Sequence, residues 1–178
     1  KLEEKKSPEF AKKKPDLVIR TVEEFTKPEY KVDVLKLEFP AELKYTKEFE
    51  DSSFYAGSTV YDLREVRSFC KRLDETAQQP WVILSAGVDI EEFIEDVRYA
   101  VEAGASGFLC GRAIWKDCVE YYPDVDKMED FIQEQCVQNF KNANEVAEDA
   151  LPWFEHKKFG GWDNVKLAKQ NPTWCEDY

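Results

Sequence analysis

The sequence is poor in the residues that build metal sites and disulfide frameworks. It contains one histidine, His156, and an odd set of five cysteines without a Cys-x-x-Cys pair. Because a structural zinc site needs several closely spaced His or Cys ligands, no metal site is expected. Reduced thiols in the cytoplasm are the simplest interpretation of the cysteines, and no cofactor is predicted. The cysteines are Cys70, Cys110, Cys118, Cys136 and Cys175.

The sequence also lacks long apolar runs and an excess of positive charge. No stretch of about 18 apolar residues and no signal peptide is visible, so no membrane partner is expected. The formal net charge of −12 disfavours nucleic acid, and a phosphorylated ligand would need a local site of cations or backbone N–H groups. The chain opens on Lys1 and its only methionine is Met128. We therefore expect that an amino-terminal portion precedes it.

Apolar and amphipathic segments alternate along the rest of the sequence. Helical periodicity and capping residues predict helices at 15–27, 62–78, 89–104 and 127–147. Short apolar runs predict strands at 32–40, 81–85 and 107–112. A loop at 41–61 is longer than most connections, which makes it a candidate functional lid.

This alternation predicts an α/β protein with a parallel sheet covered on both faces. Doubly wound sheets and (β/α)8 TIM barrels both satisfy the pattern. Three strands cannot close a barrel, and 178 residues fall short of the roughly 250 that a barrel typically needs. We therefore expect the last three β/α units, strands 6–8, of a TIM barrel. Residues 1–178 would form the carboxyl-terminal part of one barrel domain, with 151–178 as a tail packing on the barrel or on a partner.

Lys36 lies in the middle of the first apolar strand, which ends at Pro40. A lysine there is expected to point into a crowded, partly desolvated place, where burial favours the neutral amine. A neutral amine can attack a carbonyl and form a Schiff base. The alternative is an edge-strand lysine with its amine in water. Glu38 shares the face of Lys36, so it is a poor general base and a better ion-pair partner for an inward cation such as Lys36.

The next two strands end in residues that suit a phosphate. Ser85 and Gly87 follow the second strand, and Gly111 and Arg112 follow the third. Glycine permits close backbone approach, while serine and arginine add a hydroxyl donor and a permanent cation. The alternative is that both glycines are turn residues and Arg112 pairs with a neighbouring acid.

Three further residues are expected to have structural or solvated roles. His156 lies in a polar tail segment and is predicted to be on the surface. Lys44, in the long loop, is predicted to be a solvated charge, although it could touch a phosphate. Cys110 is predicted to be a small buried hydrophobe, because no histidine lies near it in sequence to activate the thiol.

Three stretches resemble the class I tagatose 1,6-bisphosphate aldolases. They contain the patterns Asp-Val-Leu-Lys-x-Glu-x-Pro, Leu-Ser-Ala-Gly-Val and Leu-Cys-Gly-Arg-Ala-x-Trp, and the similarity runs from about 12 to 151. The family belongs to a wider group of Schiff-base barrel aldolases that includes sulfofructose phosphate aldolase. Of the three patterns, the first and the third are specific.

The resemblance implies a TIM barrel that cleaves a ketose 1,6-bisphosphate, without metal, into dihydroxyacetone phosphate and glyceraldehyde 3-phosphate. Lys36 matches the Schiff-base lysine. Ser85 and Gly87 match the phosphate loop after strand seven, and Gly111 and Arg112 match the loop after strand eight. The acid/base carboxylate of the family lies on an earlier strand, which this chain does not contain.

Three functions stay open at this stage. The first is a ketose bisphosphate aldolase, and the second is a related enzyme for a sulfonated ketose phosphate. The third is a non-catalytic half-barrel or interaction subunit, because the first strand would leave a parallel edge unpaired. The expected partners are a phosphorylated sugar and either a second copy of the chain or a complementing amino-terminal half.

Overall fold

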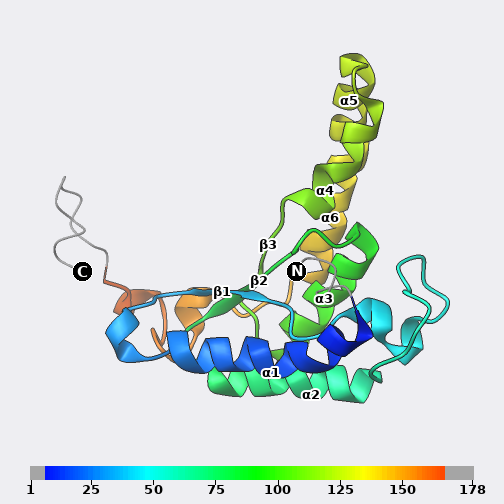
Figure 1. Cartoon of the computed structure of the whole chain (residues 1–178). Coiled ribbons are helices and arrows are strands. Elements are labelled where there is room, and N and C mark those ends of the chain that lie inside the picture. The colour runs from blue at the N-terminus through cyan, green and yellow to red at the C-terminus, as the bar shows by residue number, and fades with distance from the viewer. Residues whose placement is uncertain (1–6, 167–178) are drawn as a thin grey trace.

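A computed structural model describes residues 7–166 of the chain (Figure 1). Its first helix, α1 (Pro8–Phe25), is capped by Ser7, whose side chain accepts a hydrogen bond from the Phe10 N–H at 3.2 Å. Pro8 occupies the first turn, where a proline costs no hydrogen bond. The predicted start at Pro15 is therefore wrong, because Ser7 and Pro8 already supply the start and Pro15 lies inside the helix.

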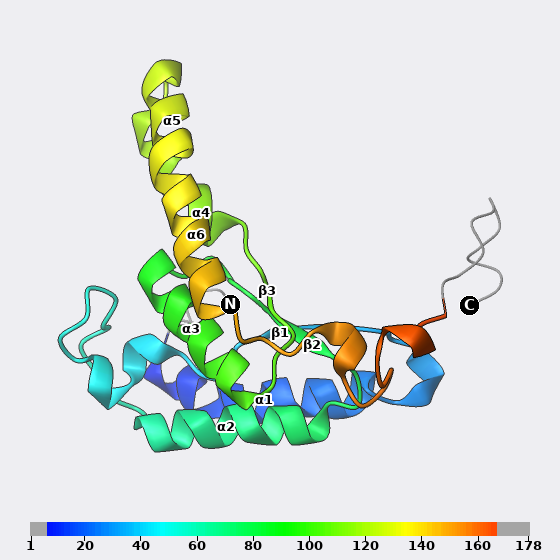
Figure 2. The ribbon, with the colours of Figure 1, turned by 180° about the vertical axis from the view of Figure 1, so that it is seen from behind.

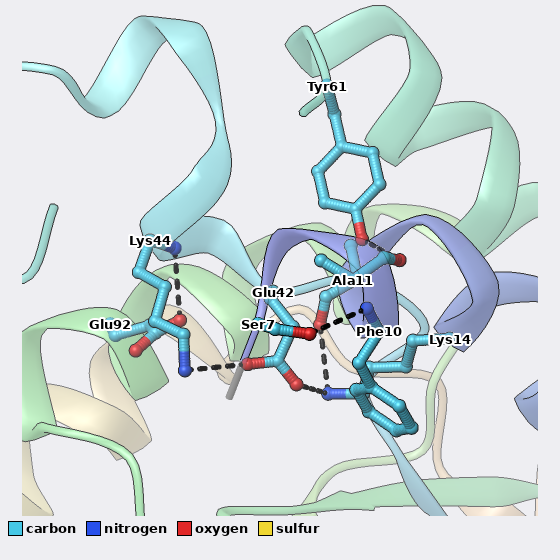
Figure 3. A network of polar contacts seen from close by, with 9 residues as sticks. Ser7, Phe10, Ala11, Lys14, Glu42, Lys44, Tyr61 and Glu92 are labelled. Atoms are coloured by element: carbon cyan, nitrogen blue, oxygen red, sulfur yellow. Dashed lines mark hydrogen bonds and ion pairs between the residues drawn. The ribbon is translucent and has the colours of Figure 1, made fainter. Parts of the chain in front are cut away.

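Pro15 changes the hydrogen bonding of α1. Because proline lacks an N–H, the carbonyl of Ala11 has no helical donor four residues later. The hydroxyl of Tyr61 donates to this carbonyl instead (Figure 3). A proline inside α1 thus connects the helix to the end of the long loop.

The sheet consists of three parallel strands in the order β1-β2-β3. They are β1 (Leu35–Glu38), β2 (Trp81–Leu84) and β3 (Phe108–Leu109). Leu35 is in register with Trp81, and Leu84 with Leu109. The strands are shorter than predicted. β1 cannot pair further back because its next partner would be Pro80, which has no N–H to donate.

Two helices connect consecutive strands of the sheet. In α2 (Leu63–Thr76), Asp62 and Glu65 form a reciprocal capping box that fixes the start of the helix. α3 (Ile90–Ala103) ends at Gly104, whose φ of 116° is the left-handed conformation that favours glycine. Asp89 stands at the start of α3, but its side chain makes no capping hydrogen bond there. It pairs with Lys116 instead.

The helices do not cover both faces of the sheet. α1 and α2 run side by side along one side of it (Figure 1). Along β1, Leu35 and Leu37 are buried while Lys36 and Glu38 are exposed. The prediction of two covered faces is therefore wrong for the described residues. Only the face that carries the leucines is packed.

The residues after β3 form an arm that projects from the body of the molecule (Figure 2). The arm contains α4 (Arg112–Trp115), α5 (Val125–Phe131), a π-helical turn (Ile132–Cys136) and α6 (Val137–Val146). The predicted helix at 127–147 is thus interrupted by the π turn. The base of the arm is fixed by the Phe140 ring, which packs edge-on against Phe108 at 5.9 Å.

The described part of the tail folds back toward β1. Its aromatic rings form a cluster, and Lys158 donates a hydrogen bond to the carbonyl of Val32, just before β1. His156 is only 5% exposed, so the prediction of a surface histidine is wrong. Burial, with a smaller contribution from Lys157, lowers its pKa. The rest of the predicted tail, including Cys175, lies outside the described residues.

Candidate active site

The strand ends line an open pocket of about 390 Å³, which we call the strand-end pocket. It brings together four of the residues predicted for the site: Lys36, Ser85, Gly111 and Arg112. The other lining residues are Leu84, Ala86, Leu109 and Cys110. The pocket is therefore lined by two cations and no carboxylate, in a chain whose net charge is −12. Such a lining favours an anion.

Lys36 reaches the pocket from the uncovered face of the sheet. Its side chain is exposed in the described part of the chain, so the predicted desolvated environment is wrong there. The physical reason is that no layer of the described protein packs on this face. Lys36 nevertheless lines the same pocket as the loops that follow β2 and β3, where the site was predicted.

The loop after β2 makes room for the arginine. Ser85 is buried, and its carbonyl accepts a hydrogen bond from the Val88 N–H at 3.0 Å. Ala86 and Gly87 follow with φ values of 49° and 82°, both in the left-handed region. A Cβ atom on Gly87 would lie 3.1 Å from the Arg112 Cζ atom. Glycine at this position therefore allows the guanidinium to lie directly against the loop backbone.

The two other polar residues near the pocket have different surroundings. Cys110 is half-buried, and burial raises the pKa of its thiol although a hydrogen bond with Ser85 partly offsets the effect. Glu38 lies on the face of Lys36, but within the described residues no ion pair joins the two. The predicted pairing of Glu38 with Lys36 is thus not formed.

Sequence reasoning missed a group of buried charges outside the strand-end pocket, which we call the charged network (Figure 3). Lys14, from α1, lies 2.7 Å from one oxygen of Glu42, and Lys44 lies 2.9 Å from the other. The backbone N–H of Lys44 donates to Glu92, from α3, at 3.1 Å. Lys44 is therefore a paired structural residue, and the prediction of a solvated charge is wrong. The network ties the start of the long loop to α1 and α3.

The pKa values of the buried carboxyl groups in and beside the network shift in opposite directions. Burial opposes ionisation of Glu42, but Lys14 and Lys44 outweigh it and lower the pKa. Burial raises the pKa of Glu92. One turn further along α3, Asp96 is 5% exposed, and burial raises its pKa well above the usual range. One Asp96 carboxyl oxygen makes no hydrogen bond to the described protein.

Two features are absent from the described residues. Residues 7–166 contain no group of three or more His, Cys, Asp or Glu side chains that could hold a metal ion. No helix in this range has the length and apolar character to span a membrane.

The parallel sheet, its crossover helices and the pocket at the strand ends define an α/β protein with a pocket lined by two cationic side chains. The sequence profile described as "DeoC/LacD family aldolase" matches residues 2–117. A tagatose 1,6-diphosphate aldolase of Staphylococcus aureus (strain MSSA476) is 36% identical over 156 residues, which are 85% of this chain and 46% of that protein. One from Listeria monocytogenes serotype 4a (strain HCC23) is 32% identical over 167 residues, 91% of this chain and 47% of that protein.

The chain therefore belongs to the DeoC/LacD family of aldolases, as the resemblance indicated. It spans about half the length of the curated relatives that it matches.

Proposed function

We propose that the chain carries the Schiff-base and phosphate-binding part of a class I aldolase acting on a ketose 1,6-bisphosphate of the tagatose type. The observation that supports this most directly is the strand-end pocket, which is lined by Lys36, Arg112 and two strand-end loops and by no carboxylate. The names of the relatives at 32–36% identity support the same substrate class.

In the proposed reaction, the neutral amine of Lys36 attacks the ketone of the sugar. Loss of water from the carbinolamine gives an iminium ion. A general base then removes the proton from the hydroxyl on the fourth carbon. The bond between the third and fourth carbons breaks, its electron pair moves into the iminium to form an enamine, and glyceraldehyde 3-phosphate leaves. Protonation of the enamine carbon and hydrolysis then release dihydroxyacetone phosphate and the free lysine.

The phosphate loops would position the substrate for this attack. The guanidinium of Arg112 can form charge-assisted hydrogen bonds to a phosphate beside the Ser85 hydroxyl and the Gly111 backbone N–H. Holding the ketose by a phosphate keeps its carbonyl near the amine, and such positioning supplies a large part of the rate enhancement of well-ordered sites. The general base is expected from polypeptide that supplies the rest of the barrel.

A specific observation supports a second candidate function, a half-barrel subunit that acts only with a partner. Lys36 and Glu38 are exposed on a sheet face that the described residues leave uncovered. In a closed barrel this face would form the interior. A sulfonated ketose phosphate is the alternative substrate, because the strand-end pocket would bind only one anionic end of the sugar and does not decide the other.

Borohydride trapping tests the proposal. The chain is incubated with dihydroxyacetone phosphate and sodium borohydride, and the reduced adduct is located by peptide mass spectrometry. We expect the adduct on Lys36 and its complete loss in Lys36→Arg, which keeps the charge but lacks a primary amine. Lys47→Arg, at an exposed lysine outside the pocket, is the matched control and should label as the unmodified chain does. An adduct that persists in Lys36→Arg would contradict the assignment.

A further inference from the structure

The long loop at 41–61, which has no role in the proposed reaction, forms part of a second pocket. This pocket has a volume of about 450 Å³, and we call it the loop pocket. Its lining comes from α1, the long loop, the loop after β2, α3 and the arm. Ala86 lines both the loop pocket and the strand-end pocket, so the two pockets adjoin. The volume lies within the range of about 300–1,000 Å³ that is usual for small-molecule sites.

The charged network forms one wall of the loop pocket (Figure 3). Glu42 and Lys44 belong to this wall and are paired with each other at 2.9 Å. Glu92 also lines the pocket, although it is only 4% exposed. One Glu92 carboxyl oxygen accepts a hydrogen bond from the Lys44 N–H, and the other makes none to the described protein. Because buried polar atoms are normally hydrogen-bonded, this second oxygen is a position for a ligand that donates.

The charges around the loop pocket nearly balance. Lys116, from the arm, pairs with Asp89 at the start of α3. Glu38 adds an exposed carboxylate. Burial raises the pKa of Glu92, so this carboxyl group keeps its proton more readily than an exposed one. The lining therefore offers several hydrogen-bond donors and acceptors with little net charge, in contrast to the strand-end pocket with its two cations and no carboxylate.

Two aromatic rings supply the apolar part of the lining. Phe10 comes from the first turn of α1, and Phe54 comes from the long loop. The Phe54 ring packs against Phe49 with 5.2 Å between the ring centroids. The neighbouring Ser53 donates a hydrogen bond to Glu91 of α3. These contacts fix the part of the long loop that carries Phe54 beside the pocket. Aromatic walls with a few polar groups are typical of sites for small organic ligands.

We propose that the loop pocket binds the hydroxyl groups of a neutral, polyhydroxylated ligand such as a sugar. A hydroxyl group donates and accepts, so it satisfies the second Glu92 oxygen and a lysine ammonium group together. The carboxylates of the lining disfavour a phosphate, and the two lysines disfavour a polycation. The phenylalanine rings cover the C–H groups of the sugar.

The hydroxyl groups have two possible sources. One is a separate, unphosphorylated sugar, and this source is independent of the proposed function. The other is the far end of a ketose whose phosphate occupies the adjoining strand-end pocket, and this source rests on the proposed function. Neither source requires that Lys36 forms a Schiff base.

Isothermal titration calorimetry with D-tagatose, a neutral ketohexose, tests the loop pocket. We expect saturable binding of one sugar per chain. Glu92→Leu keeps the bulk of the side chain but removes the acceptor, so it should weaken binding at least about tenfold. Glu95→Leu removes a carboxylate of α3 that pairs with Arg98 outside the pocket, and should weaken binding less than about twofold. An absence of saturable binding, or equal effects of the two substitutions, would overturn the proposal.

Two substitutions in the long loop keep the test decisive if Glu92→Leu does not fold. Phe54→Ala removes an aromatic wall and should weaken D-tagatose binding about fivefold. Tyr55→Ala changes the next aromatic residue, which does not line the pocket, and should weaken binding less than about twofold. Circular dichroism checks that every variant folds. Equal losses in Phe54→Ala and Tyr55→Ala would contradict the position of the sugar.

Tagatose 6-phosphate separates the two sources. If it binds more tightly than D-tagatose and is weakened by both Glu92→Leu and Arg112→Ala, one molecule occupies both pockets. Equal affinity of the two sugars, unchanged in Arg112→Ala, supports a separate neutral sugar. If D-tagatose does not bind and the sugar phosphate depends on Arg112 but not on Glu92, the loop pocket is refuted and the proposed function stands. Borohydride labelling is scored separately, so the lack of a Lys36 adduct refutes only the catalytic proposal.

Discussion

The charged network and the strand-end pocket both contain two cationic side chains. In the network these side chains are paired with a carboxylate, and in the pocket they are not. In the network, Lys14 and Lys44 bind the two oxygens of one buried carboxylate, Glu42. In the pocket, Lys36 and Arg112 line a space without any carboxylate. The network therefore satisfies its charges internally, whereas the pocket leaves its positive charge available to a ligand. The comparison separates cations that hold the fold from cations that the proposed function assigns to a ligand.

The largest effect is expected on stability, when one lysine of the charged network is removed. Lys14→Met leaves the Glu42 carboxylate buried with one of its two partners removed, so the free energy of unfolding should fall by about 3 kcal/mol. Urea denaturation measures the change. Lys36→Met is the matched control, because its side chain is exposed and its loss should change stability by less than about 0.5 kcal/mol. Equal losses in both variants would mean that the two lysines do not differ in this way.

The second expected effect is on the binding of an anion in the strand-end pocket. Arg112→Ala removes the permanent cation of the strand-end pocket and should weaken binding of inorganic phosphate about tenfold to a hundredfold, the value of a charge-assisted hydrogen bond. Isothermal titration calorimetry measures the dissociation constant. Arg98→Ala removes an arginine of α3 that pairs with Glu95 outside the pocket, and should leave the affinity unchanged. An unchanged affinity in Arg112→Ala would remove the guanidinium from the site.

The third effect sharpens the role of the loop after β2. Gly87→Ala forces a side chain into a left-handed backbone and toward the guanidinium of Arg112, so stability should fall by about 1–2 kcal/mol and phosphate affinity should also fall. Gly57→Ala is a close control, because its φ is 77° but no atom lies within 4 Å of the added Cβ. It should show the same strain with unchanged affinity. Equal affinity losses would show that backbone strain, and not contact with Arg112, is responsible.

The sequence was sufficient for local features and insufficient for distant ones. The alternation of apolar and amphipathic segments predicted the order of strands and helices, and Asp62 and Gly104 marked a helix start and a helix end, because these signals lie within a few residues of each other. The start of α1 was missed because Ser7 stood outside the apolar stripe that defined the predicted helix.

The charged network could not be predicted because its pairs are remote in sequence. Lys14 and Glu42 are 28 residues apart, and Lys44 and Glu92 are 48 apart. Without the fold, each of these residues has the pattern of a solvated surface charge. The residues of the strand-end pocket are equally remote, but parallel strands bring their carboxyl ends to one edge, so topology alone indicated that they meet.

The smallest effect concerns a buried acid beside the network, Asp96. Burial, reinforced by the neighbouring Glu92, raises its pKa. The folded protein therefore holds this proton at a higher pH than the unfolded chain. Its stabilising contribution is complete below the unfolded pKa of about 4 and is lost as the pH rises through the folded value. Glu42 acts in the opposite window, because its lowered pKa makes its contribution disappear on acidification.

The side chain introduced by Asp96→Asn has no proton to lose. This substitution therefore separates the pH range in which Asp96 affects stability from the range in which Glu42 does. At pH 8 we expect Asp96→Asn to be about 1 kcal/mol more stable than the unmodified chain, because no buried carboxylate forms. Between pH 4 and pH 8 its free energy of unfolding should fall less steeply, while the loss of stability below pH 4, which depends on Glu42 and its lysines, stays the same. Denaturation across this range measures both slopes. Parallel curves for the two proteins would show that Asp96 is already ionised in the fold, and that α3 tolerates a buried charge next to the network.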